Sequence, residues 1–187
     1  NSIIELITSW VAVSMIWKGL LNPEFGIINS IIEFFGGTGP AWLQDPAFVL
    51  PSVIMVSVWK DVGFLSIIFI GGLQGISSEY YEAAQIDSAS KWQQFRKITL
   101  PLLSPTTFYA LIITIINSFQ VFDQIWIMTA GEPTADLVPV MVTEIYKNSF
   151  QYQKMGYATA LSWILFAIII GVTIFQNVMQ KKWVHYE

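Results

Sequence analysis

The sequence of 187 residues contains no cysteine and a single histidine, His185. Without cysteine the chain cannot form disulfides, thiolate metal sites or a cysteine nucleophile, and it shows no evident pairing of a nucleophile with a base. We therefore expect no catalytic residue, no metal and no cofactor. Charge is scarce as well, because only 12% of the residues are Asp, Glu, Lys or Arg, about half the share of an ordinary soluble domain.

Two kinds of ligand are excluded by the same scarcity. The formal net charge is −4, and no basic patch is long enough to follow a phosphate backbone, so we expect no nucleic-acid partner. The chain also has no Gly-rich phosphate loop ending in Lys and Ser or Thr, so it should not itself bind ATP.

Apolar residues make up 54% of the chain, including 13 Phe, 8 Trp and 7 Tyr. Several of the aromatic residues stand at the ends of apolar runs, where rings lie at the level of the lipid headgroups. Four runs approach or exceed the length needed to cross a bilayer, namely residues 3–21, 47–76, 104–128 and 157–180. The sequence therefore predicts an all-α polytopic membrane helix bundle of about four transmembrane helices.

Two of the less regular stretches leave alternatives open. The run 47–76 exceeds one bilayer thickness, so we expect it to be tilted, broken near Gly63 or extended beyond the membrane. Residues 26–35 carry a helical apolar pattern that predicts either a short amphipathic helix on the membrane surface or a packed loop with a helical turn.

Residues 82–105 form a polar island between apolar runs, and the loop around them is the segment 77–103. Ser77 or Ser78 can cap a first short helix, and Ser90 with Gln93 has the spacing of a capping box that begins a second one. Trp92, Phe95 and Ile98 form one apolar edge of that second helix, and Pro101 and Pro105 limit any continuous helix. The pattern predicts a helix, a bend and a second helix.

Four spans place both termini and the segment 77–103 on one face of the membrane. Lysine and arginine are more frequent on that face than on the other, which is the bias expected of a cytoplasmic side. The residues concerned are Lys91, Arg96, Lys97, Lys181 and Lys182 inside, against Lys147 and Lys154 outside.

The same segment has a longer motif. Glu82, Ala83 and Ala84 are followed after three residues by Ser88, and after nine more by Ile98-Thr99-Leu100-Pro101. This pattern resembles the EAA loop of the inner-membrane permease subunits of ABC importers. The one departure is Ser88, where the family usually has Gly, and it argues against a bend that only Gly could adopt.

The resemblance extends over most of the chain, through the run before the EAA loop and through the tail, which looks like that of sugar-type permeases. Glu132 departs from a Gly often found there. The tail residues concerned are Phe122, Asp123, Met128, Thr129, Gly131, Pro133, Ile145, Tyr146, Phe150, Gly156, Ala158 and Ala160.

What the resemblance implies is the permease subunit of an ATP-driven importer of a sugar or related polar solute, in a bacterial or archaeal inner membrane. Residues 1–187 would be one transmembrane domain, the C-terminal part of a longer permease, with 77–103 as its cytoplasmic coupling loop. The implied partners are cytoplasmic ATPase subunits, a second identical or homologous permease, an extracytoplasmic solute-binding protein and membrane lipid. The implied ATPase-coupling residues are Glu82, Ala83, Ala84, Asp87, Ser88, Ile98, Leu100 and Pro101.

Polar residues inside the apolar runs are the candidates for a solute path. Asn117, Gln120 and Gln124 share one face of the predicted third helix, with Asp123 close by, as either interhelical hydrogen bonding or the wall of a hydrated path.

Lys60 and Asp61 lie near the middle of the run 47–76. Since adjacent helix residues point about 100° apart, we expect each to find a partner on another helix, or to belong to a pathway. Two other functions are the alternatives. The first is an ion-coupled secondary transporter that uses Lys60, Asp61 and Asp123, and the weaker one is a membrane-embedded enzyme. The sequence does not specify the solute or whether the permease pair is identical.

Overall fold

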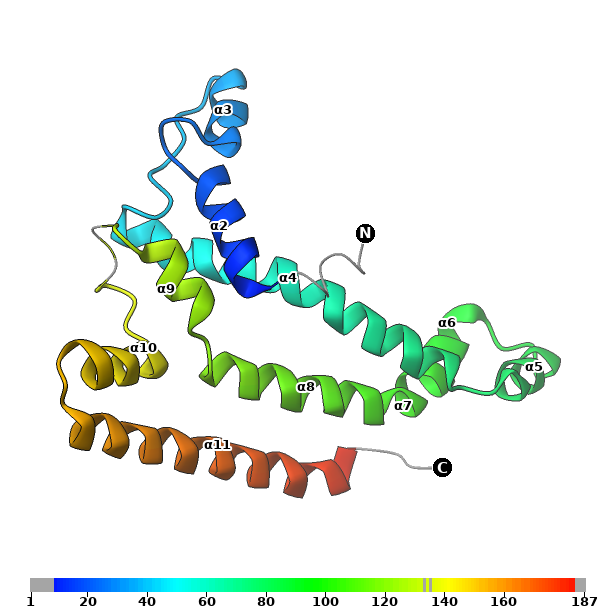
Figure 1. Cartoon of the computed structure of the whole chain (residues 1–187). Helices are drawn as coiled ribbons and strands as arrows, with labels where there is room; N and C mark the ends of the chain where they lie inside the picture. The colour runs from blue at the N-terminus through cyan, green and yellow to red at the C-terminus, as the bar shows by residue number, and fades with distance from the viewer. Residues whose placement is uncertain (1–8, 133, 135, 184–187) are drawn as a thin grey trace. The chain divides into compact units, whose positions relative to one another are not determined.

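The computed structural model describes residues 9–132, 134 and 136–183, with side chains up to residue 180. These residues form helices and no strand, which confirms the all-α fold class. They divide into two compact units, one comprising residues 1–63 with 119–165 and the other 64–118 with 166–187. The helices α4 (Pro46–Gln74) and α11 (Met155–Trp183), which Figure 1 labels, each contribute residues to both units.

The first unit is built from helices that come from both ends of the chain. These are α2 (Trp10–Leu20), α3 (Ile27–Phe34), the first part of α4 (Pro46–Gln74), α9 (Asp123–Thr129), α10 (Met141–Tyr146), the π-helical η2 (Lys147–Gln151) and the start of α11 (Met155–Trp183).

Its core is a cluster of apolar side chains from α2, α4 and α9. Val49, Val53 and Val56 recur at helical spacing on α4 and are 2% exposed or less. They pack in one cluster with Val13 of α2 and Met128 of α9. This burial joins segments far apart in the sequence.

The second unit carries the segment 77–103. It contains the rest of α4, α5 (Ser78–Ile86), α6 (Lys91–Gln94), the π-helical η1 (Phe95–Thr99), α7 (Leu100–Leu102), α8 (Ser104–Phe119) and the rest of α11. A Cβ on Gly72 of α4 would lie 2.4 Å from Thr106 Oγ1 of α8, so only glycine permits this close approach.

Among the residues that the structure describes, two helices are long and apolar enough to cross a membrane: α4 and residues 155–180 of α11. Residues 91–102 and 104–119 meet the same criterion only as a pair bent by 58°. The described part of the predicted first span, α2, is a shorter apolar helix, and residues 3–8 lie outside the described residues. The helix α4 is continuous through Gly63, which excludes the break and leaves a tilt or an extension beyond the membrane as the alternatives.

The predicted continuous third helix over 104–128 is also wrong. The helix α8 ends at Phe119 and α9 begins at Asp123, with Phe122 between them at φ −140° and ψ −64°. The ring of Phe122 stacks on Trp126 at 5.7 Å and lies 5.2 Å from Tyr146. We infer that this ring packing, which links α9 to a helix more than twenty residues away, holds the chain in the break. The polar residues around it therefore do not share one helix face.

Helical structure continues through Pro101, where the sequence predicts a limit to the helix. Helical structure runs from Lys91 to Leu102, with the π-helical η1 ending at Thr99, two residues before Pro101, and the bend falls at Leu103. Proline lacks an N–H and its ring crowds the carbonyl four residues earlier, and the wider π-helical turn gives that ring space.

The predicted polar loop 129–155 contains a helical segment, formed by α10 and η2.

Candidate functional site

The helix α5 presents the Glu82 motif on an exposed face. Ser77 caps it, as predicted, by accepting a hydrogen bond from the Glu79 amide at 3.3 Å. Glu82 and Ala83 are exposed, and Ile86, four residues after Glu82, is 85% exposed. Because residues i and i+4 lie on the same helix face, a carboxylate and an apolar side chain project together from this surface.

The bend after α5 is a Schellman motif. The Ala89 amide donates to the Ala84 carbonyl at 2.9 Å and the Ser88 amide donates to the Gln85 carbonyl at 3.0 Å. Ser88 has a φ of +55°, in the left-handed region. The bend therefore has the backbone shape that glycine adopts most easily, although serine occupies the position.

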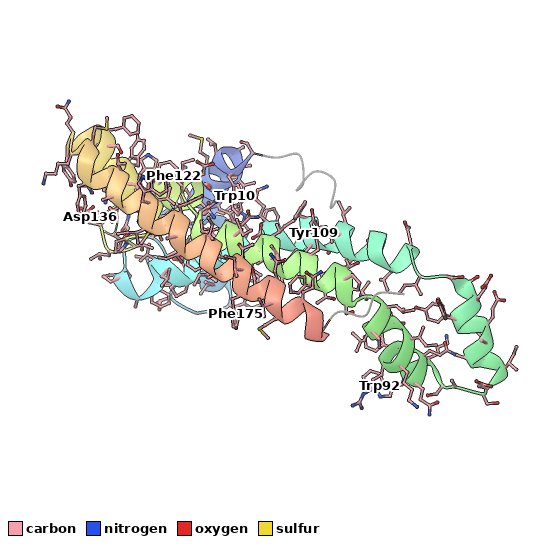
Figure 2. The ribbon with its side chains drawn as sticks, turned by 90° about the horizontal axis from the view of Figure 1, so that it is seen from below. Trp10, Trp92, Tyr109, Phe122, Asp136 and Phe175 are labelled. Carbon is pink, nitrogen blue, oxygen red and sulfur yellow. The ribbon has the colours of Figure 1, made fainter. Side chains whose placement is uncertain are left out.

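The second short helix begins with the predicted capping box. The Ser90 amide donates to Gln93 Oε1 at 2.8 Å, and the Gln93 amide donates to Ser90 Oγ at 3.3 Å. Trp92 and Phe95 stack at 5.7 Å on the predicted apolar edge, and Trp92 is 68% exposed on the outside of the segment (Figure 2).

Two hydrogen bonds tie the helices of this loop to one another and to the bend. The hydroxyls of Tyr81 on α5 and Thr99 in η1 lie 2.9 Å apart, and Gln94 Nε2 donates to the Ala89 carbonyl at 3.0 Å. A cavity of about 340 Å³ lies between the helices, lined by Ala84, Asp87, Ala89, Gln93, Gln94, Lys97 and Ile98.

The structure thus brings some predicted coupling residues together and separates others. Ala84, Asp87 and Ile98 line one cavity. Leu100 and Pro101 belong to α7, where Leu100 is 47% exposed. Sequence reasoning missed Ile86 and the outward position of Trp92. The spacing of Ile86 from Glu82 was the available signal, because it places both on one side of α5.

The candidate path residues fall on both sides of the break after α8. Asn117 lies in the last turn of α8, Gln120 in the turn that follows and Asp123 at the start of α9, and all three are exposed. Gln124 is only 5% exposed. The burial of Gln124 is that of a packing residue, whereas the other three side chains expose hydrogen-bonding groups at the surface.

Lys60 has a partner on another helix, as predicted. Its ammonium lies 5.0 Å from the centroid of the Trp10 ring on α2, within the range of a cation–π contact. This contact gives Lys60 a structural role in the first unit. For Asp61 the corresponding expectation stays a prediction.

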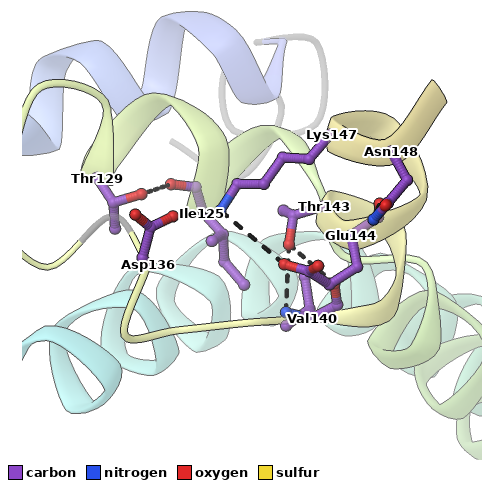
Figure 3. Close-up of polar contacts among 8 residues, drawn as sticks. All are labelled: Ile125, Thr129, Asp136, Val140, Thr143, Glu144, Lys147 and Asn148. Carbon is purple, nitrogen blue, oxygen red and sulfur yellow. Dashed lines mark hydrogen bonds and ion pairs between the residues drawn. The ribbon is translucent and has the colours of Figure 1, made fainter. Parts of the chain in front are cut away.

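Ion pairs order the predicted outer loop. Lys147 of η2 donates to Asp136 Oδ1 at 2.6 Å and lies 3.9 Å from Glu144 Oε1 (Figure 3). The hydrogen bond that Lys147 donates to Asp136 is the largest of the effects that raise the pKa of Lys147 above its ordinary value. The contribution of the charged ammonium to stability is therefore lost as the pH rises through that raised pKa.

The turn at Gly131 is the second ordered feature of this loop. Gly131 has a φ of +76°, and the Glu132 amide donates to the Thr129 carbonyl at 3.0 Å. Glu132, the departure from the family's Gly, lies 3.6 Å from Lys18 of α2, whose ammonium also donates to the Ala130 carbonyl. The substitution therefore adds an ion pair between this turn and α2.

The helical domain and its polar loop of two short, mutually bonded helices agree with the resemblance to a permease subunit of ABC importers. Residues 3–185 match the family described as binding-protein-dependent transport system inner membrane component, and the chain belongs to that family.

Relatives and a solved structure agree with this assignment. A probable ABC transporter permease protein of Brucella suis biovar 1 is 39% identical over 163 residues, which are 86% of this chain and 56% of that protein. The trehalose/maltose transport system permease protein MalF of Thermococcus litoralis is 34% identical over 161 residues, 84% of this chain and 53% of that protein.

The solved structure is that of a bacterial alginate ABC transporter in complex with an alginate pentasaccharide-bound periplasmic protein. One of its chains is 28% identical with a TM-score of 0.87, and the match covers 96% of this chain and 62% of that one. The present chain thus spans a little more than half the length of these relatives.

Proposed function

We propose that this domain is the transmembrane part of a permease subunit in an ATP-driven importer of a sugar or related polar solute. Membership of the transport family supports the reaction class. The carbohydrates named for the trehalose/maltose permease and the alginate transporter support the solute class. Since the chain spans only part of these relatives, we propose that it is the C-terminal domain of a longer permease.

The proposed partners follow from the same assignment. ATP hydrolysis occurs in separate cytoplasmic ATPase subunits that dock on the segment 77–103, and a second permease subunit completes the pathway. The periplasmic protein in the alginate transporter supports an extracytoplasmic solute-binding protein as the donor of solute.

The exposed pair of Glu82 and Ile86 on α5 is the observation that carries the proposal. A carboxylate can accept charge-assisted hydrogen bonds from a basic partner surface, each contributing about 1.5–3 kcal/mol. Burial of an isoleucine side chain contributes about the same amount. An exposed carboxylate beside an exposed isoleucine is therefore suited to a protein partner.

Coupling requires that the loop move as one body. The contacts from Tyr81 to Thr99 and from Gln94 to Ala89 connect the two short helices, so a force on α5 is passed to η1 and then to α7 and α8. When ATP closes the ATPase pair, the docked loop follows and the equilibrium of the permease shifts toward its outward-facing state.

Glu82→Lys tests the proposal in the assembled transporter reconstituted in proteoliposomes. We expect ATP hydrolysis stimulated by the binding protein, and uptake, to fall by at least about tenfold, because one charge-assisted hydrogen bond of 1.5–3 kcal/mol is lost and the charge is reversed. Glu33→Lys is the matched control, since it makes the same charge reversal at an exposed position outside the segment 77–103 and should retain most of the activity.

Ile86→Ser provides a second measurement, in which the fraction of ATPase that co-purifies with the permease should fall. Full stimulation and uptake in both Glu82→Lys and Ile86→Ser would show that α5 is not the docking element. Uptake driven by an ion gradient without ATP hydrolysis would instead support a secondary transporter.

A further inference from the structure

The helix α3 buries one polar side chain, that of Asn29. Asn29 is 4% exposed, its Oδ1 accepts a hydrogen bond from Trp42 Nε1 at 2.7 Å, and its Nδ2 donates to the Pro40 carbonyl at 3.2 Å. A Cβ on Gly39 would lie 2.2 Å from Asn29 Cγ, so the following loop closes tightly on this side chain. Ile28 packs against the core of the first unit. These contacts fix the rotation of α3 about its axis.

The opposite face of α3 is apolar and exposed. Ile27, Ile31 and Phe34 recur at i, i+4 and i+7 and are 60%, 54% and 85% exposed. Phe35, next in the chain, is 81% exposed and packs edge-on against Phe34 at 5.4 Å. A contiguous apolar surface of this kind marks contact with an apolar partner, because exposing it to water is unfavourable.

Lipid is the partner that the surroundings of α3 favour. The helix lies between α2 and the membrane span α4 in the chain, and Figure 1 shows it beyond the C-terminal end of α2. The part of α4 in the same unit also exposes apolar side chains, with Ile54, Val58 and Val62 at 52%, 56% and 55%. Eight residues of helix are too short to cross a bilayer, so α3 would lie along its surface.

Charge indicates the type of lipid contact. The sequence has no Lys or Arg between Lys18 and Lys60, and the exposed charge on α3 is the carboxylate of Glu33. Attraction to anionic headgroups would need basic residues, so the contact must depend on burial of apolar side chains among the acyl chains.

We propose that α3 is an interfacial anchor whose face of Ile27, Ile31 and Phe34 inserts into the outer leaflet of the membrane. The anchor holds the connection between α2 and α4 at the membrane surface, whatever solute the transporter carries. Its action is independent of salt, because no basic side chain takes part.

A fluorescent probe on a single cysteine tests the anchor, and the absence of native cysteine makes the labelling specific. Ile31→Cys and Glu33→Cys in the full-length permease, reconstituted in phosphatidylcholine vesicles, are labelled with an environment-sensitive dye. We expect brominated lipids to quench the probe at residue 31 several-fold more than the probe at residue 33, and aqueous iodide to show the reverse. Neither pattern should change between low and high salt.

Every other pattern overturns the proposal. Iodide quenching at residue 31 equal to that at residue 33 would place the face in water. Protection of residue 31 from both quenchers would show that protein covers it, either another part of the permease or a partner subunit. Glu33→Cys is the control for folding, since it lies on the same helix but away from the apolar face.

Discussion

At the scale of single residues, Ser88 is the position where the backbone and the side chain disagree. The Schellman motif at the end of α5 requires a left-handed residue, and a φ of +55° costs a residue with a Cβ more than it costs glycine. In the sequence, the departure of Ser88 from the family's Gly argues against a bend that only Gly could adopt. The bend is present, and serine bears the conformational cost.

Ser88→Gly should therefore stabilise the end of α5 by about 1 kcal/mol, since glycine adopts positive φ without steric cost. Hydrogen exchange at the Ala89 amide, which donates to Ala84, should slow by a factor of about five. Ser88→Val should accelerate that exchange, because a β-branched side chain is disfavoured at positive φ, and it should also weaken ATPase docking. Equal exchange in all three proteins would show that the bend at Ser88 is not left-handed in the full-length protein.

At the scale of elements, the break between α8 and α9 separates residues that a continuous helix would have aligned. Asn117 and Gln120 are exposed near the end of α8, whereas Gln124 is buried in α9. An exposed carboxamide can donate and accept hydrogen bonds with a hydroxyl-rich solute. A buried one is more effective in holding the fold.

Asn117→Leu and Gln120→Leu should each reduce uptake, because each removes hydrogen bonds to solute that contribute about 0.5–1.5 kcal/mol apiece. Initial rates of uptake would fall by roughly two- to tenfold at solute concentrations below half-saturation, with assembly with the ATPase unchanged. The matched control is Ser118→Ala, since the Ser118 hydroxyl donates to the Thr114 carbonyl at 2.7 Å and its proton is not free to bind solute. Normal kinetics in both leucine variants would assign these residues to helix packing.

At the scale of the whole molecule, the lysine bias and the number of spans predict which loops face the cytoplasm. The structure changes the choice of positions for testing this orientation, because Asn29 in the first outer loop is buried and hydrogen-bonded. Exposed positions on the same loops avoid damage to the fold, and Glu33, Gln85, Lys91 and Gln151 meet that condition.

A membrane-impermeant thiol reagent applied to intact cells should label Glu33→Cys and Gln151→Cys and leave Gln85→Cys and Lys91→Cys unlabelled. Permeabilised cells should label all four, which controls for reactivity. The reason is that the basic segment 77–103 stays on the cytoplasmic side, where positively charged loops are retained. Labelling of Gln85→Cys in intact cells would reverse the orientation and remove α5 from reach of any cytoplasmic ATPase.

Local features of the chain were determined by the sequence alone. Ser77 and the capping box of Ser90 with Gln93 begin their helices as predicted, because a cap depends on atoms three residues apart. The spans of α4 and α11 follow from the length of their apolar runs. The motif beginning at Glu82 likewise indicated the permease family before any contact was known.

Other features were decided by the tertiary structure, because they depend on contacts between distant parts of the chain. The packing of Phe122 with Tyr146 accompanies a break that the apolar pattern of 104–128 does not show. The bonds of Asn29 to Trp42 and Pro40 turn the apolar face of α3 outward, whereas the sequence permits a helix of either orientation. Periodicity shows which residues share a face, and only packing decides which way that face points.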